Sequence, residues 1–265
     1  MARRGARQVT SPGGPDRSPE RGRPEPWSPE EWTRETAPAA AEARPAPARP
    51  QPSRRVRRAP APVAGEIAQA VGERRAARLE QRLVDAAQAF DRGRPQDAYR
   101  IVRPLAEEAP EAAAIRELAG VSLYRLGRWK QAIGHLEAFV RLTASVEQHP
   151  VLADCYRALG RHNKVEELWD ELRQASPGAA LVVEGRIVMA GSLADRGDVK
   201  DAIALLERGP AAPRKPGDHH LRLWYALADL YERAGDTPRA REVFARIVSA
   251  DPDLADAAER LAALA

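Results

Sequence analysis

The chain has 265 residues, 43% hydrophobic and 30% charged, so it is long enough to bury a sizeable core. Its single cysteine, Cys155, excludes an internal disulfide framework and a multi-cysteine zinc site. The net charge of +4 is unevenly spread, because the basic excess lies within residues 1–62 and the rest of the chain is slightly acidic.

Residues 1–62 are rich in proline, arginine, alanine and glycine and hold few large aliphatic side chains. Such a segment cannot bury enough apolar area to offset the entropy lost on ordering, which predicts a disordered tail over 1–62 and a folded domain over 63–265. Arginine far outnumbers lysine, and alanine is abundant. This bias is typical of a GC-rich genome, so we expect a bacterial protein. Either codon usage or a need for guanidinium chemistry could explain the arginines, and the pattern leaves both open.

One island in the tail has helix-start chemistry. In Trp27-Ser28-Pro29-Glu30-Glu31-Trp32, the serine suits an N-cap, the proline suits the first helical position, and the second glutamate completes a capping box. The two tryptophans, Trp27 and Trp32, occupy the flanking staple positions. They form either an anchor for the groove of a partner or a chance pair that packs on the protein's own body.

From residue 63 onward, apolar residues recur with a helical period, and β-branched alternation is absent, which predicts an all-α fold. The pattern also repeats. A glycine is followed five residues later by a small residue in Gly93/Ala98, Gly127/Ala132, Gly160/Val165, Gly197/Ala202 and Gly235/Ala240. Each glycine is expected in the turn between two helices, and each small residue where the second helix approaches the first.

The last unit is the most complete, with Trp224, Leu227, Ala228, Tyr231, Gly235, Ala240, Phe244 and Pro252. It resembles the tetratricopeptide repeat (TPR), and the other four units match in part, so the resemblance covers about residues 75–265. It implies a right-handed α-solenoid of about five helix pairs, generally a protein-binding scaffold with varied partners. Asp251 and Pro252 are expected to start a capping helix over 253–264, with Leu254, Ala258 and Leu261 packed inward.

In such solenoids the first helix of each pair lines the concave face. By repeat register, acids outnumber arginines there, which predicts a mildly acidic groove for a protein or peptide, favouring a basic one. The tail of this chain is one candidate occupant, and a solvated charge pattern without a ligand is the alternative. The groove residues expected to contact a partner are Glu117, Tyr124, Asp154, Arg157, Glu184, Asp195, Tyr225, Asp229 and Glu232.

A second hypothesis is an RNA- or ribosome-associated factor. Arginines cluster at the end of the tail and recur four residues apart on the first helix of the domain, where they would attract phosphates without reading bases. A solubilising linker and a solvated helix face are the alternatives. The candidate contacts are Arg54, Arg55, Arg57, Arg58, Arg74, Arg78 and Arg82.

The sequence contains no convincing catalytic constellation. It has no phosphate loop, nucleophile elbow or dinucleotide fingerprint, and no histidine stands at metal-ligand spacing. We therefore expect a non-enzymatic scaffold without cofactor or metal. Because no signal peptide or long apolar run is visible, we expect a cytoplasmic protein without a membrane span; the oligomeric state stays open.

Overall fold

The structure, a computed structural model, describes residues 65, 67–69, 72–210, 213 and 215–264, all within the compact unit of residues 44–265. The predicted boundary at residue 62 lies outside the described residues. So do the tail predictions for Trp27, Trp32, Arg54, Arg55, Arg57 and Arg58.

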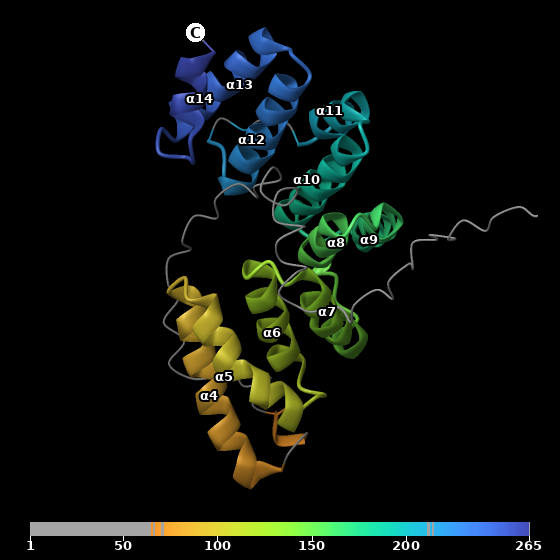
Figure 1. Ribbon diagram of the computed structural model, residues 1–265, viewed down its shortest axis with the longest axis vertical. Helices are drawn as coiled ribbons and strands as arrows, with labels where there is room; N and C mark the ends of the chain where they lie inside the picture. The colour runs from red at the N-terminus through yellow and green to blue at the C-terminus, as the bar shows by residue number, and fades with distance from the viewer. Residues whose placement is uncertain (1–64, 66, 70–71, 211–212, 214, 265) are drawn as a thin grey trace, which may run out of the picture. The chain divides into compact units, whose positions relative to one another are not determined.

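The described residues form helices and no strand, which confirms the all-α prediction. Ten of these helices make five successive pairs, and one more follows at the C-terminus (Figure 1). The first helices of the pairs are α4 (Glu73–Asp91), α6 (Ala113–Arg125), α8 (His149–Ala158), α10 (Ala179–Asp195) and α12 (Asp218–Arg233). The second helices are α5 (Pro95–Glu108), α7 (Trp129–Thr143), α9 (His162–Ala175), α11 (Val199–Glu207) and α13 (Thr237–Ala250), and α14 (Ala257–Ala263) ends the array.

Each helix packs against the next along the chain, and each first helix also contacts the first helix of the following pair. A pair therefore buries its apolar face against its neighbours, as a repeat array requires. The fold is an all-α solenoid of five helix pairs with a short final helix, as the repeat pattern predicts.

The turn glycines explain why each pair bends where it does. All five have a positive φ, from 67° at Gly160 to 92° at Gly197, a conformation that residues with a side chain rarely adopt. In each turn the amide after the glycine donates to a carbonyl in the last turn of the first helix; one example is Arg161 to Tyr156, at 2.9 Å. These bonds satisfy carbonyls that the helix end would leave without a partner.

The small residues predicted at the pair interface are all buried. Ala98, Ala132, Ala202 and Ala240 are fully inaccessible, and Val165 is nearly so. Gly120 in α6 shows how close the approach is, because a Cβ built there would lie 2.7 Å from the Leu136 side chain of α7. The close packing inferred from the sequence is therefore confirmed.

The final helix differs from the prediction. It begins at Ala257, not at residue 253, because Ala255 has a φ of 51° and interrupts helical geometry. The buried residue is consequently Ala257, whereas Ala258 is exposed. Leu254 and Leu261 still pack against the core, as expected.

Candidate functional site

The nine predicted groove residues all lie on first helices, which confirms the helix assignment though not their role. Glu117 and Tyr124 belong to α6, Asp154 and Arg157 to α8, and the remaining five to α10 and α12. We call this surface the first-helix face. The structure adds that most of these side chains form hydrogen bonds or ion pairs within the protein. These contacts join each first helix to the next first helix, to the residue just before it, or to α14.

The centre of the first-helix face is a network that joins three helices. The Tyr124 hydroxyl of α6 donates to Asp154 of α8 at 2.8 Å, and Arg157 Nε donates to the same carboxylate at 2.8 Å. Arg157 Nη1 reaches Asp195 of α10 at 2.9 Å. One guanidinium thus links two carboxylates on different helices.

This network is mostly shielded from water. The side chains of Asp154 and Arg157 are 12% and 14% exposed, and that of Asp195 is 31% exposed. Burial opposes the charge on Arg157, but the two carboxylates outweigh it and raise the pKa of the guanidinium. Burial, followed by the Asp154 charge, raises the pKa of the Tyr124 hydroxyl. Two carboxylates and one guanidinium leave the network with one net negative charge.

Two further contacts join neighbouring repeats on either side of this network. Glu117 of α6 accepts a hydrogen bond from Gln148 Nε2, just before α8, at 2.7 Å. Glu184 of α10 pairs with Arg222 of α12 at 2.6 Å. Burial raises the pKa of Glu184, and the nearby Arg222 opposes that rise. Gln148 was missed by the sequence analysis.

The C-terminal end of the face is organised by Arg260 of α14. Its guanidinium donates to Asp229 at 2.9 Å and also to Glu232, and lies 4.7 Å from the centroid of the Phe244 ring. The Tyr225 hydroxyl donates to Asp256 at 2.6 Å. Asp256 is itself exposed, so this hydrogen bond lies at the surface.

Arg260, like Gln148, is a residue of this face that the sequence analysis missed. It follows Asp229 by 31 residues, close to one repeat. Extending the repeat register into the last helix would have placed it on the first-helix face.

The arginines proposed as nucleic-acid contacts lie on α4. Arg74 and Arg78 are exposed, and Arg82 is half-buried. Arg78 approaches Glu108 of α5 at 3.5 Å, which neutralises part of its charge. RNA contact by these residues stays a prediction.

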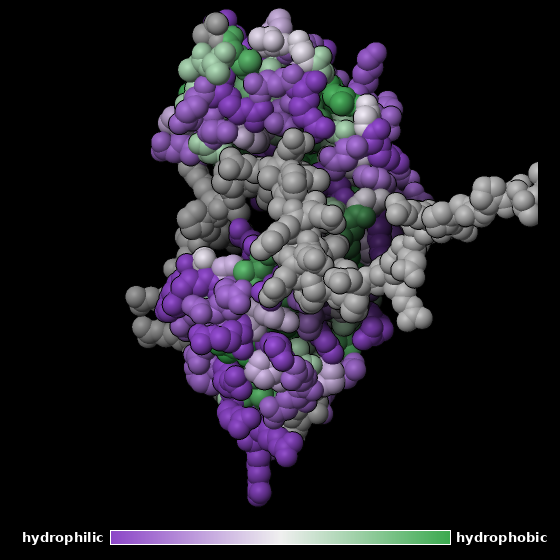
Figure 2. Space-filling model, in the orientation of Figure 1, coloured by the Kyte–Doolittle hydropathy of each residue, from purple (hydrophilic) through white to green (hydrophobic). Residues whose placement is uncertain are grey.

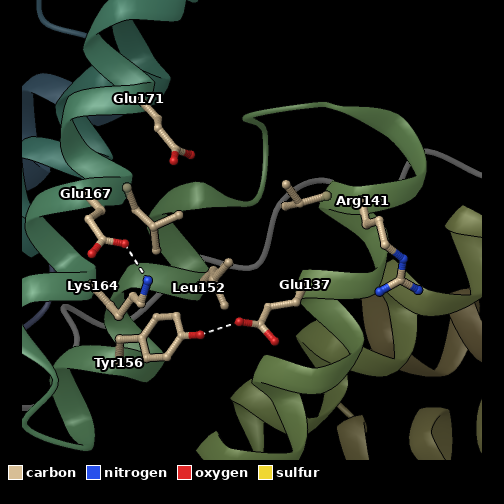
Figure 3. A pocket seen from close by; sticks show the side chains of 9 residues that line it. Glu137, Arg141, Leu152, Tyr156, Lys164, Glu167 and Glu171 are labelled. Carbon is tan, nitrogen blue, oxygen red and sulfur yellow. Dashed lines mark hydrogen bonds and ion pairs between the residues drawn. The ribbon is translucent and has the colours of Figure 1, made fainter.

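A cavity of about 300 Å³ lies between α7, α8 and α9, and none of the nine predicted groove residues lines it. Figure 3 shows Tyr156 pointing to Glu137 and Lys164 pointing to Glu167, with Leu152 between the helices. Lys164 and Glu167 are 2.5 Å apart, and Tyr156 donates to Glu137. The labelled polar groups of the cavity are thus largely engaged with one another.

Other features bear on chemistry and on location. Among the described residues, no group of three His, Cys, Asp or Glu side chains could hold a metal ion. Cys155 is fully buried, and burial raises the pKa of its thiol.

No described helix combines the length and apolar character that crossing a membrane requires. On the face in Figure 2, hydrophilic residues cover most of the described surface.

Comparison with known proteins identifies the repeats. Residues 88–147 and 221–264 each match a tetratricopeptide-repeat family model. No curated protein matches the chain. A solved TPR protein of Thermus thermophilus is 19% identical, with a TM-score of 0.55 over 70% of this chain and 98% of its own.

The TPR-like repeats of a putative kinesin light chain from Podosopora anserina are similar too. They are 18% identical, with a TM-score of 0.50 over 66% of this chain and 95% of theirs. At these identities the likeness concerns the fold, and it agrees with the helix pairs, turn glycines and buried small residues described above. Residues 88–147 and 221–264 are therefore tetratricopeptide repeats, and the described helix pairs have the fold of a TPR solenoid.

Proposed function

We propose that the first-helix face binds an extended segment of a partner protein that carries basic side chains. Tetratricopeptide repeats generally mediate protein–protein interactions and generally form non-catalytic scaffolds. The finer proposal rests on how the charged side chains of this chain are arranged.

The observation that carries the proposal is the network of Tyr124, Asp154, Arg157 and Asp195. Their hydrogen bonds hold carboxylates from two helices in fixed positions before any ligand arrives. A preorganised site loses less side-chain entropy on binding than a set of mobile charges does. Asp195 is the most exposed carboxylate of the network, so it is the group that a partner would meet first.

Charge along the face favours a basic partner. The central network carries one net negative charge. The C-terminal end carries two further net negative charges, because Arg260 stands against three carboxylates, those of Asp229, Glu232 and Asp256. Opposite charges steer a basic segment onto the face and disfavour an acidic one.

The test uses the full-length protein and three fluorescent peptides of equal length that are basic, neutral and acidic. We expect fluorescence anisotropy to show the tightest binding for the basic peptide. The variant Asp195→Asn should weaken that binding roughly fivefold, since one exposed charge pair contributes at most about 1 kcal/mol.

The matched control is Glu242→Gln, because Glu242 lies on α13, a second helix, and its side chain is 72% exposed. It removes the same charge from another surface and should leave the affinity unchanged. Equal affinity for all three peptides, or equal loss in both variants, would show that the first-helix face does not select basic segments.

A further inference from the structure

The turns of the second and third helix pairs carry a group of exposed cations. Three of them surround the α6–α7 turn, and the fourth lies in the α8–α9 turn. Corresponding turns of consecutive repeats lie side by side along one edge of a solenoid. Trp129 and Leu159, which flank these two turns, pack against the same apolar cluster. We call the four residues the basic turn edge: Arg125, Arg128, Lys130 and Arg161.

The basic turn edge is open to solvent and has no partner among the described residues. All four side chains are exposed, and none makes a hydrogen bond or ion pair there. The guanidinium carbon of Arg125 lies 5.8 Å from the Phe90 ring centroid, and that of Arg161 lies 6.0 Å from the Tyr156 ring centroid. A guanidinium that lies over an aromatic ring keeps its N–H groups free to bind oxygen atoms.

Acidic side chains are missing from the segments that carry these cations. Residues 118–136 and 155–165 contain no Asp or Glu. The next acid along α7, Glu137, lies about two helical turns beyond Lys130 and accepts a hydrogen bond from Tyr156. A carboxylate that approaches the two turns therefore meets cations without an acidic neighbour in the same segments.

The positive charge is confined to these two turns. The other cations of the third turn are already engaged, because Arg157 pairs with two carboxylates and Lys164 lies 2.5 Å from Glu167. Around the fourth turn, acids outnumber bases by three to two within residues 195–201. The surface therefore suits a short anionic ligand better than a long one.

Helix formation does not favour arginine at two of these positions. Arg128 and Arg161 are the N-cap residues of α7 and α9, and neither side chain caps its helix. Arginine has no acceptor for the first amides, and its charge opposes the positive end of the helix dipole. At the same position α11 and α13 have Asp198 and Asp236, and Asp236 accepts from the Arg239 amide at 3.2 Å. Residues that run against local preference are typical of functional surfaces.

We propose that the basic turn edge binds a short acidic segment of a partner protein, in which several Asp or Glu side chains stand close together. The carboxylates would pair with exposed cations that have no other partner. A nucleic-acid strand fits less well, because it would run past the two turns and meet the acids around the fourth. The proposal does not depend on the first-helix face, whose charge favours a basic segment.

The test probe is a blocked peptide of four glutamates, titrated at low ionic strength into the full-length ¹⁵N-labelled protein. The Trp129 indole N–H, which donates to none of the described residues, reports on the edge, and Trp129→Phe assigns its signal. We expect the glutamate peptide to shift this signal to saturation and the same peptide with glutamines to leave it in place. Added salt should weaken the binding, because exposed charges are screened.

Arg128→Gln and Arg161→Gln should each weaken binding roughly threefold, and the double variant roughly tenfold, since exposed charge pairs contribute little singly and add when they are separate. Both residues are exposed and neither caps its helix, so the variants should keep the backbone spectrum of the natural protein. The indole signal remains available in each of them.

Lys130 and Lys200 form a matched pair of test and control. Each is exposed and follows its turn glycine by three residues, but Lys200 lies between Asp198 and Asp201. Lys130→Gln should weaken binding about twofold, whereas Lys200→Gln should leave the affinity unchanged, although both remove the same charge.

Three results would overturn the proposal. The first is a signal that the glutamate peptide does not shift, or that the glutamine peptide shifts equally. The second is undiminished affinity in the double variant Arg128→Gln/Arg161→Gln. The third is tighter binding of an oligouridine of equal charge, which would identify a nucleic-acid surface instead.

Discussion

Individual residues of the first-helix face are held by partners within the chain. Arg157 illustrates the principle, since its guanidinium donates to Asp154 and to Asp195 at hydrogen-bond distance. A largely buried charge is tolerable only with such partners. The same contacts fix the geometry that a ligand would meet, so the stability and the recognition of this face depend on the same side chains.

Residue size matters most where helices nearly touch. A Cβ at Gly185 would lie 2.3 Å from Leu172 Cδ2 and 3.3 Å from Trp169 Cε3. Leu172 is almost fully buried, so it has little room to move away. We expect Gly185→Ala to lower the free energy of unfolding by about 1–3 kcal/mol, the usual cost of overpacking, as measured by urea denaturation.

Gly134 in α7 provides the control for this substitution. It is exposed and helical, and a Cβ there meets nothing within 4 Å. Gly134→Ala should therefore raise the stability by about 0.5–1 kcal/mol, because alanine loses less backbone entropy in a helix. A similar response of the two variants would contradict the close approach of α10 to α9.

We expect the free energy of unfolding to fall at alkaline pH because of Tyr231. Burial, and then its hydrogen bond to Glu207 at 2.6 Å, raise its pKa from 10.0 to about 12. The folded protein therefore keeps this proton where the unfolded chain has lost it. The stabilising contribution is complete below pH 10 and disappears as the pH rises towards about 12.

Urea denaturation at a series of alkaline pH values checks this expectation. Tyr231→Phe should lose less stability than the natural protein over the same range. Tyr99→Phe is the control, because the Tyr99 hydroxyl has no hydrogen-bond partner within the described part of the chain. Tyr99→Phe should lose as much stability with rising pH as the natural protein. If Tyr231→Phe also loses as much, the expectation is contradicted.

At the scale of the element, α14 is short and depends on one side chain. It has one buried residue, Ala257, and Arg260 ties it to Asp229 and Glu232 of α12. Isolated helices of this length are not stable in water, so tertiary contacts must hold it. The Arg260 contacts also cover the acidic end of the first-helix face.

Removing the Arg260 guanidinium should therefore loosen α14 before the rest of the array. We expect Arg260→Gln to speed amide hydrogen exchange in residues 257–264 roughly tenfold, the effect of about 1.4 kcal/mol on local opening. Mass spectrometry of peptides from α12 and α14 measures it. Arg241→Gln on α13 is the control, since this exposed arginine has no side-chain partner among the described residues; unchanged exchange in Arg260→Gln would contradict the dependence.

At the scale of the whole array, stability is close to a sum of repeats and the interfaces between neighbours. The network of Tyr124, Asp154, Arg157 and Asp195 strengthens two such interfaces, because it joins α6, α8 and α10. Cooperative unfolding of the middle repeats should therefore depend on Arg157.

We expect Arg157→Met to lower the free energy of unfolding by about 3 kcal/mol, because it leaves two carboxylates without their partner. The urea transition, followed by circular dichroism, should also broaden as the repeats uncouple. Arg196→Met is the control. Arg196 pairs with Glu166 at 2.8 Å, but both side chains are more exposed, so its loss should cost about 1 kcal/mol or less. Equal costs would refute a special role for the buried network.

The sequence by itself determined the helices, their pairing and the turns. Each turn needs a residue that tolerates positive φ, and each pair needs a small residue at its close approach. Both requirements are local, so the Gly-to-small spacing predicted them directly. It also determined that the predicted groove residues lie on first helices, because repeat register follows from the same spacing.

Only the tertiary structure decided which of these side chains meet. The link from Arg157 to Asp195 joins residues 38 apart, and the start of α14 depends on the left-handed Ala255, which no sequence period marks. The contacts of Arg186 with the Trp169 ring and the Leu205 carbonyl also form only when α9, α10 and α11 come together. Helix formation follows from local periodicity, whereas charge pairing depends on distances across repeats that the chain acquires only on folding.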